Sequence, residues 1–345
     1  MPKKQVSPEQ MDVGRSEIPD EVLLARNESL WVTRSIIVLI TLAAIYAAAT
    51  LWAAHNAWPV TLGVVSWYDI LIVIALVAVG LLIRAARWHY YLHVLDWRIP
   101  LGPSLVAFVA SIALTATPGK AGELIKFVLL RSRFPISLTK GSGILLIERL
   151  GDLFAVIALA IGGLTLFIDL SSYVLASVIV VGAVVVLATK SRVMLVRAQA
   201  IPKLRALSLK LMNMLDAVQL LVRPLPLVIG GSLALTAWSC EALAFHFLIG
   251  RLGIHCSLLI SFSIYGLSTL AGALSMLPGG IGGVEVVMAF LLTRLATPAS
   301  VATIAVVIFR LCTLWLFSLI GVIFLFAWMV FLTKRRRPNL VVEVK

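Results

Sequence analysis

The chain has 345 residues, of which 61% are hydrophobic and only 13% are charged, and its formal net charge is +13. Soluble domains average about 45–50% apolar and about 25% charged residues, so this composition excludes an ordinary soluble protein. The apolar residues form blocks of about 20, the length that crosses the hydrocarbon core of a bilayer. Most Lys and Arg residues lie in the loops and tails between these blocks, which indicates a membrane-topology signal and not nucleic-acid binding.

A polar segment, residues 1–30, opens the chain and is predicted to be a cytosolic N-terminal tail. The apolar block after it has no small-residue cleavage pattern and is expected to be a retained signal anchor. The apolar blocks are residues 35–54, 67–88, 101–117, 143–168, 172–189, 225–249, 257–277 and 301–332. Short apolar stretches, 122–130 and 283–292, follow two of them, and a basic tail, 334–345, is predicted to be cytosolic. The membrane domain is predicted to cover residues 31–333.

The longest polar connection, residues 190–223, is predicted to be cytosolic. Leu204, Leu207, Leu211 and Leu215 recur at spacings of three and four, which is typical of an amphipathic helix. Such a helix lies on a membrane surface or simply connects two spans, and both interpretations stay open.

Two topologies distribute the basic residues differently. If every block spans the membrane, loops 118–140 and 190–223 place twelve basic residues outside, against the positive-inside tendency. If 101–130 is a re-entrant hairpin from the cytosol and 257–292 is another from the opposite side, only Arg251 and Arg294 face outside. Then 25 of the 29 basic residues face the cytosol. Each hairpin arm, with about 15 residues, reaches about 22 Å, which passes the midplane without crossing the bilayer.

The preferred fold class is therefore an all-α polytopic membrane protein in the plasma or inner membrane, with both termini cytosolic. It has two re-entrant helical hairpins and about six full spans within eight main hydrophobic segments. The predicted full spans are residues 35–54, 67–88, 143–168, 172–189, 225–249 and 301–332.

The two hairpins carry similar sequences at their tips. The first tip reads Pro118-Gly119-Lys120-Ala121-Gly122-Glu123, and the second reads Pro278-Gly279-Gly280-Ile281-Gly282-Gly283-Val284-Glu285. Each is followed by an apolar stretch, a turn and a long helix with an early arginine, Arg149 or Arg310. The offset between corresponding features is nearly the same for the prolines and for the arginines. The pattern predicts an internal repeat of inverted orientation, residues 66–168 and 225–332, an architecture typical of transporters.

Pro and Gly at each tip permit a sharp reversal and leave helix-end amides free. These amides, at the positive end of a helix dipole, suit an anionic group such as a lipid phosphate.

Ionisable residues inside apolar segments are costly, which makes them functional candidates. They are Glu123, Lys126, Glu148, Arg149, Asp152, Glu241, Glu285 and Arg310. In a functional interpretation, Arg149 and Arg310 hold a phosphate while the glutamates gate it or take up a proton. In a structural interpretation, Glu123 and Glu285 pair with the two arginines and hold each hairpin to the next helix. Both stay open, because an arginine fork can serve a carboxylate and a phosphate in turn.

Local spacing adds two expectations. Glu148 and Asp152 share a helix face, and Arg149 is close enough to touch Asp152. The stretch from Arg84 to His93, which includes Arg87, is interpreted as an interfacial belt of aromatic and basic residues.

The sequence predicts no metal site and no cofactor. His89 and His93 are four residues apart but lack a third ligand, and the three cysteines have no metal-binding spacing. The motifs GxSxG, HExxH, GxGxxG and the P-loop are absent, so the chain is not expected to be an enzyme.

The chain resembles the flippase-like transmembrane domain of lysylphosphatidylglycerol synthases. The resemblance lies in the two tips, in Glu148-Arg149-Leu150-Gly151-Asp152 and in Phe309-Arg310. That domain also occurs alone in the family 0104 membrane proteins, some of which are associated with hopanoid or polar-lipid metabolism. The resemblance covers residues 66–332 and departs from the family pattern at Gly283-Val284. It implies lipid translocation, and it argues against lysyl transfer, since only the short tail 334–345 follows the last span.

The expected function is therefore a lipid translocator that moves or binds a polar lipid with an anionic or phosphate headgroup. The alternative is a membrane-embedded enzyme or accessory subunit in polar-lipid, hopanoid or polyprenyl-linked glycan synthesis; a scaffold without transport is the third hypothesis. In the first hypothesis Lys126 assists at the cytosolic mouth. The expected partners are membrane lipids and lipid-synthesis enzymes, not nucleic acid, and no oligomeric state is predicted. The candidate substrate-binding residues are Pro118, Gly119, Gly122, Glu123, Lys126, Glu148, Arg149, Asp152, Pro278, Gly279, Gly280, Gly282, Glu285 and Arg310.

Overall fold

The computed structural model describes residues 41, 65–115, 122–164 and 202–335, and the regular elements of this part are all helices. The all-α prediction is confirmed there. Several predictions fall outside the described residues: the spans 35–54 and 172–189, Pro118 and Gly119 at the first tip, residues 190–201 of the connector, and nearly all of both tails.

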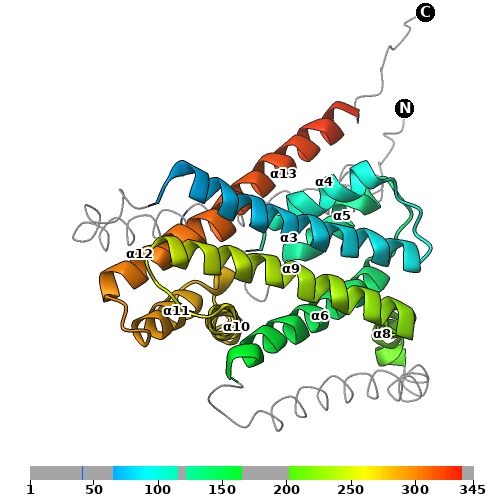
Figure 1. Ribbon diagram of the computed structural model, residues 1–345. Helices are drawn as coiled ribbons and strands as arrows, with labels where there is room; N and C mark the ends of the chain where they lie inside the picture. The colour runs from blue at the N-terminus through cyan, green and yellow to red at the C-terminus, as the bar shows by residue number, and fades with distance from the viewer. Residues whose placement is uncertain (1–40, 42–64, 116–121, 165–201, 336–345) are drawn as a thin grey trace, which may run out of the picture.

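Two long apolar helices form the centre of the protein. Helices α3 (Trp67–Val94) and α9 (Pro224–Arg251) have 28 residues each, about 42 Å at 1.5 Å per residue. Ser66 caps α3 in a capping box with Asp69, and a proline opens α9. The two helices pack side by side (Figure 1). They are antiparallel, because Asp69 at the start of α3 forms an ion pair of 2.9 Å with Arg251 at the end of α9.

A third long apolar segment joins α12 (Ala299–Arg310), a π-helical turn (Leu311–Trp315) and α13 (Leu316–Arg335). The segments Trp67–Val94, Pro224–Arg251 and Ala299–Val330 are the three that are long and apolar enough to cross a membrane in the described part of the chain. The π turn begins directly after Arg310, and such turns often lie at functional sites.

Helix α6 (Leu138–Leu164) corresponds to the predicted span 143–168, and α8 (Pro202–Leu221) lies in the predicted connector. Helix α8 packs along α6, and its residues Leu215, Val218 and Leu221 are buried. Leu207 and Leu209 are exposed, so the helix also carries apolar side chains away from α6. Both interpretations of this helix therefore stand, since it packs on α6 and also presents leucines outward.

Both predicted hairpins are present as pairs of short helices. The first consists of α4 (Leu101–Ile112) and α5 (Ile125–Arg131), and the second of α10 (Leu258–Leu274) and α11 (Gly283–Thr293). At 1.5 Å per residue the longest of these arms reaches about 26 Å, less than the roughly 30 Å of a hydrocarbon core.

The hairpins open at opposite ends of the protein. The first hairpin follows the C-terminal end of α3, whereas the second follows the C-terminal end of α9. Because α3 and α9 are antiparallel, these two ends are far apart, on the right and on the left of Figure 1. The inverted arrangement expected from the charge count is therefore confirmed in the fold.

The inverted repeat extends to details of the backbone and side chains. The ring of His89 shares a hydrogen bond of 3.0 Å with Ser104, and the ring of His246 shares one of 2.7 Å with Ser261. The step along the chain from His89 to His246 is the same as that from Ser104 to Ser261, and we call it the repeat step. It also relates Asp96 to Gly253, which both have positive φ angles, 57° and 78°. The His–Ser pairs join each long helix to the first arm of its own hairpin.

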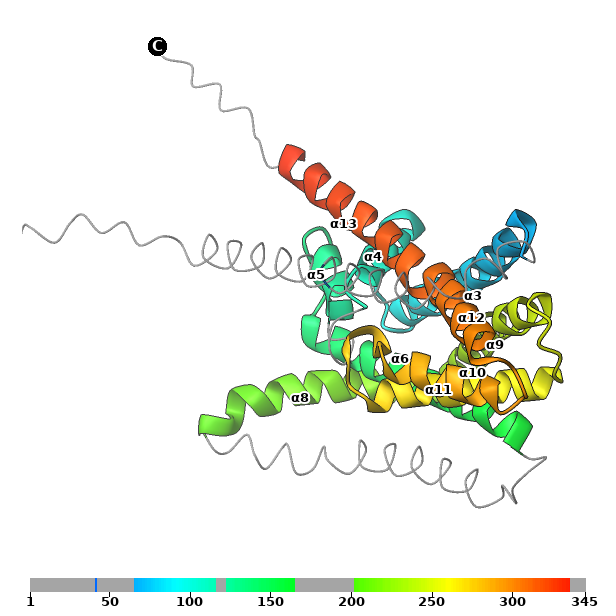
Figure 2. The same ribbon diagram turned by 90° about the vertical axis from the view of Figure 1, so that its left-hand side faces the viewer.

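The two repeats also interlock. Helix α4 packs on α13 of the second repeat, and α10 packs on α6 of the first, as the turned view in Figure 2 shows. Glycine permits both contacts: an added Cβ would lie 2.4 Å from the Ala113 nitrogen at Gly321, and 2.6 Å from the Ala160 nitrogen at Gly266. Neither hairpin could therefore move without its contact on the other repeat changing.

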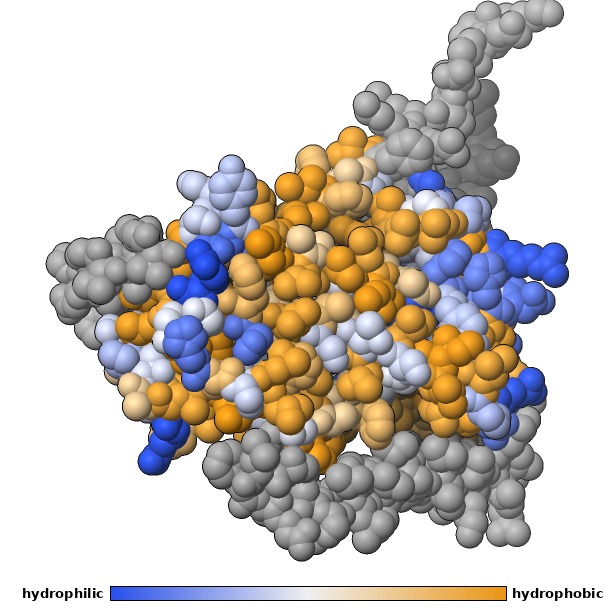
Figure 3. All heavy atoms as spheres, viewed as in Figure 1, coloured by the Kyte–Doolittle hydropathy of each residue, from blue (hydrophilic) through white to orange (hydrophobic). Residues whose placement is uncertain are grey.

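The surface agrees with a membrane protein. Figure 3 shows an apolar middle with hydrophilic residues at its left and right ends, where the two hairpins open. Large apolar side chains such as Leu71, Leu82, Leu319 and Phe326 are exposed on the long helices. In a bilayer these side chains would face lipid.

The closest approach of α3 to α9 yields a stability prediction. An added Cβ at Gly80 would lie 2.8 Å from the Ala237 carbonyl oxygen, whereas Gly231 has no atom within 4 Å. We expect Gly80→Ala to lower the free energy of unfolding by about 1–3 kcal/mol through overpacking. Gly231→Ala should be neutral or slightly stabilising, because alanine favours helix. Unfolding in mixed micelles measures both, and equal behaviour of the two variants would contradict the α3–α9 contact.

Candidate functional site

A cavity of about 380 Å³ lies where the two hairpin tips meet the long helices. Its walls are formed by residues of α3, α6 and α9, of both hairpins, and of the segment from α12 to α13. Basic and acidic side chains are concentrated on its wall within an otherwise apolar body. Those on the lining are Arg84, Arg87, Glu123, Lys126, Glu148, Arg149, Asp152, Glu241 and Arg310.

The first tip is held by an arginine of α6. Arg149 donates to the carboxylate of Glu123, which lies two residues before the start of α5. The second Nη of Arg149 lies 3.6 Å from Asp152, as the i,i+3 spacing predicts. The first hairpin is thus attached through its tip to the helix that follows it.

The second tip repeats this arrangement. Arg310 donates from Nε to Glu285 at 2.7 Å and from Nη2 to the Gly279 carbonyl oxygen at 2.7 Å. Gly279, Gly280 and Gly282 have φ angles of 64°, 67° and 89°, which glycine adopts at no steric cost. The structural interpretation of both tip glutamates as partners of the arginines is confirmed.

One helix-end amide at the second tip is not free, contrary to the expectation from the sequence. The Gly282 amide donates to the other oxygen of Glu285 at 2.7 Å, so Glu285 caps α11 itself. The expectation that the tip leaves its helix-end amides free is therefore wrong for this amide, because the carboxylate three residues later satisfies it.

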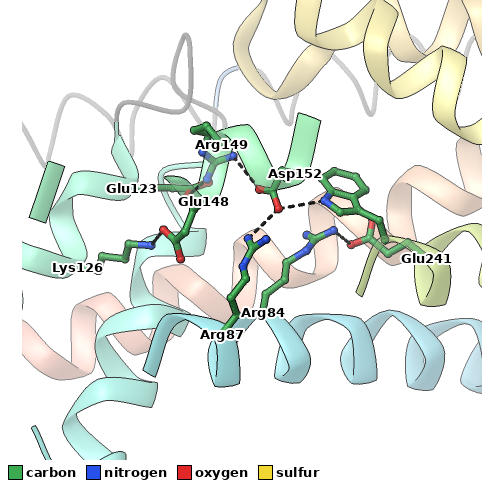
Figure 4. Close-up of polar contacts among 9 residues, drawn as sticks. Arg84, Arg87, Glu123, Lys126, Glu148, Arg149, Asp152 and Glu241 are labelled. Carbon is green, nitrogen blue, oxygen red and sulfur yellow. Dashed lines mark hydrogen bonds and ion pairs between the residues drawn. The ribbon is translucent and has the colours of Figure 1, made fainter. Parts of the chain in front are cut away.

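Asp152 joins three helices at the centre of the cavity (Figure 4). It accepts from Arg87 of α3 at 2.7 Å and from the Trp238 indole of α9 at 3.1 Å. Glu148 and Asp152 both line the cavity, as their spacing on α6 predicts.

A second arginine of α3 pairs directly across the repeats. Arg84 lies 2.6 Å from Glu241 of α9, which also accepts from the Tyr265 hydroxyl at 2.6 Å. The repeat step that relates the two His–Ser pairs also takes Arg84 to Glu241, so these two positions correspond. The Arg84 guanidinium also stacks over the Trp238 ring, 4.1 Å from its centroid. This pair therefore lies at the pseudo-twofold axis between the halves.

These contacts correct the interpretation of residues 84–93 as an interfacial belt. Arg87, Trp88 and Tyr91 are buried, and Arg84 lines the cavity. The reason is length: α3 continues to Val94, so Arg84 lies about 15 Å from its end rather than at a headgroup. The repeat step could have found Arg84, because it matches Arg84 with Glu241 just as it matches His89 with His246. It matches Arg87 with Ala244 and gives no signal there.

Lys126 and Glu148 form the most deeply buried ion pair of the described site. Their side chains are 1% and 4% exposed, and Lys126 Nζ donates to Glu148 at 2.6 Å. The ammonium also lies 4.2 Å from the centroid of the Trp88 ring. Lys126 was expected at a cytosolic mouth, and this is wrong, because α5 turns the side chain inward against α3 and α6.

The structure thus brings together most of the predicted site residues. Of the described ones, Glu123, Lys126, Glu148, Arg149, Asp152, Gly279, Gly280 and Arg310 line the cavity. Glu285 and Gly282 are attached to it through Arg310. Sequence reasoning missed Arg84, Arg87, Trp238 and Tyr265. No group of three or more His, Cys, Asp or Glu residues suited to a metal occurs in the part that the structure describes.

Comparisons with known proteins identify relatives of the chain. Residues 29–321 match the family described as the lysylphosphatidylglycerol synthase TM region. A UPF0104 membrane protein of Methanothermobacter thermautotrophicus is 26% identical over 247 residues, which cover 64% of this chain and 73% of the relative. A UPF0104 membrane protein of Methanocaldococcus jannaschii is 29% identical over 216 residues, which cover 60% of this chain and 89% of the relative.

The Lys126–Glu148 pair yields a stability prediction. Lys126→Met alone leaves a buried, unpaired carboxylate and should lower the free energy of unfolding by about 3–5 kcal/mol. Lys126→Met with Glu148→Leu removes both charges and should recover most of that loss. Unfolding in mixed micelles compares the variants, with Asp96→Asn, an exposed carboxylate, as the control. A double variant as unstable as the single one would contradict the pairing.

Proposed function

We propose that this chain, which belongs to the family of the lysylphosphatidylglycerol synthase TM region, is a lipid translocator whose cavity binds the phosphate of a polar-lipid headgroup. The observation that carries the proposal is the pair of inverted hairpins whose tips are each held by an arginine at one shared cavity. Membrane location follows from the family and the apolar helices. The identity of the cargo and its movement are the proposal.

The two tip arginines are the proposed phosphate ligands. A guanidinium presents several donors in a fixed fork that fits a carboxylate or a phosphate. Arg149 and Arg310 each use this fork on a tip glutamate, Glu123 or Glu285. A phosphate that replaces the glutamate on an arginine would release the tip of that hairpin, which couples binding to motion.

Further donors at the cavity suit an anion. Within the described residues, Arg87 Nε and Nη1 and Arg149 Nε are buried nitrogens without a hydrogen-bond partner. A buried donor without a partner costs about 1–3 kcal/mol, a cost that an anionic ligand would remove. Exposed apolar residues near the second tip, Leu274, Met276 and Leu277, are placed to contact acyl chains.

The inverted repeat suits movement between leaflets. Arg149 and Arg310 hold hairpins that open at opposite ends, so release of one tip would open the cavity toward one end only. The Arg84–Glu241 pair joins the halves at their pseudo-twofold axis and is the proposed pivot. Rocking of one repeat against the other around a fixed site is the general scheme for such folds.

The test is lipid movement by purified protein in liposomes. Acyl-labelled phosphatidylglycerol is the probe, and reduction of the label by an impermeant reagent measures its leaflet. Arg149→Gln with Arg310→Gln should slow movement by about 100-fold or more, since each lost charged hydrogen bond is worth about 1.5–3 kcal/mol. Arg131→Gln with Arg294→Gln, two exposed arginines, is the matched control.

Normal movement by the Arg149–Arg310 variant would contradict the proposed site. No movement by the unaltered protein, with any of several phosphate-bearing lipids, would contradict translocation. Conversion of the probe into a new chemical species would instead support a membrane-embedded enzyme.

A further inference from the structure

Among the residues that the structure describes, the charges of the cavity balance before any ligand enters. Its described lining carries five basic side chains and four carboxylates, and Glu285, bonded to Arg310, is the fifth carboxylate. An additional negative charge in an apolar body is costly unless a positive charge accompanies it. An anionic headgroup must therefore enter together with a cation, or one carboxylate must lose its charge.

Two ion pairs of the described cavity lack a counterpart in the other repeat. One is Arg87–Asp152, whose positions correspond to Ala244 and Thr313, and the other is Lys126–Glu148. Lys126 lies three residues after the tip glutamate Glu123, and Glu148 directly precedes Arg149. The corresponding residues of the second repeat are Met288 and Phe309, which are 0% and 2% exposed in the apolar core. The fold thus packs this place with apolar side chains in one half, so the charges are not needed to build it.

The contacts of Glu148 also distinguish it from the other carboxylates. Glu123 and Glu285 hold the hairpin tips, Asp152 joins Arg87 to Trp238, and Glu241 joins the repeats. Glu148 instead binds Lys126, whose ammonium is a compact point charge on a flexible stem rather than a fixed fork. The bonds at the two tips and at the pivot do not use Lys126 or Glu148.

The groups around the pair differ on its two sides. Arg87 and Tyr91 of α3 and Arg149 of α6 lie close enough to interact with the charge of Glu148, and Asp152 lies one helical turn later on α6. From α4 and α5 the ammonium meets aromatic rings, with Phe108 at 5.8 Å and Phe127 at 5.7 Å. A neutral Glu148 would leave Lys126 beside the cavity with its charge uncompensated, and a phosphate is the ligand that compensates it.

We infer that Glu148 is a proton-uptake site, and that each anionic headgroup enters the cavity with one proton. The inference rests on the proposed function and adds its energy source. A proton from solvent binds the Glu148 carboxylate, and the Lys126 N–H bond to that carboxylate is replaced by one to a phosphate oxygen. When the lipid leaves, the proton returns to solvent and the ion pair re-forms. Net charge is the same at every stage, and lipid movement follows the proton gradient.

Proton uptake on binding is measured directly in weakly buffered detergent with a pH indicator. Short-chain phosphatidylglycerol is the probe, and glycerophosphoglycerol provides the same headgroup without acyl chains. We expect one proton taken up per lipid bound, and affinity about tenfold weaker for each unit of pH rise over the pH range in which one proton is taken up per lipid.

Glu148→Gln mimics the protonated carboxylate, so it should bind the lipid without proton uptake and with affinity independent of pH. Lys126→Met with Glu148→Leu should also take up no proton. The exposed carboxylate variant Asp96→Asn should behave like the unaltered protein.

Three results would overturn the inference. Lipid binding without proton uptake by the unaltered protein would do so, as would unchanged uptake by Glu148→Gln. Both would leave the proposed function standing, because lipid would still bind. Uptake with glycerophosphoglycerol but not with the lipid would show that the site does not serve a lipid. Absence of any lipid binding would contradict the proposed function itself.

Discussion

Charge pairing inside an apolar body is the constraint on which this structure depends. An ionised side chain in the hydrocarbon region is costly, and breaking a buried pair costs about 3–5 kcal/mol. Every basic residue on the described cavity lining accordingly has a carboxylate within reach. The pairs also fix geometry, because each joins two different elements: hairpin to long helix, α3 to α6, or α3 to α9. Removing one charge therefore loosens the architecture as well as the site.

Some of these ion pairs occur in both repeats, and others occur in one repeat only. Glu123–Arg149 and Glu285–Arg310 are equivalent and hold the two tips, whereas Arg84–Glu241 joins equivalent positions across the axis. Lys126–Glu148 and Arg87–Asp152 belong to the first repeat alone. In the proposed transport cycle, shared pairs suit the part that is the same at both faces. Of the two unshared pairs, Lys126–Glu148 suits the proposed exchange of a proton for a headgroup, because Asp152 also holds Trp238 of α9.

The sequence predicted the two hairpins and offered both tip pairs as one of two interpretations, because Pro-Gly motifs and isolated charges stand out in apolar blocks. The apolar pattern did not place Arg84 and Arg87 in the interior, because their depth depends on where α3 ends. The apolar block stops near Trp88, although the helix continues to Val94. The inward turn of Lys126 depends on how short α5 is, from Ile125 to Arg131. Glu285 as a helix cap likewise follows from backbone geometry that composition does not reveal.

The central claim is that the two hairpins open toward opposite faces of the membrane. Labelling of single cysteines tests it most directly, in a background from which Cys240, Cys256 and Cys312 have been removed. One cysteine at a time replaces an exposed residue, Arg98 or Pro135 beside the first hairpin, or His255 or Ala296 beside the second. An impermeant thiol reagent applied to intact cells should label the His255 and Ala296 variants. It should label the Arg98 and Pro135 variants only after permeabilisation. Labelling of all four from the same face would contradict the inverted repeat and, with it, the shared cavity as a site reached alternately from both sides.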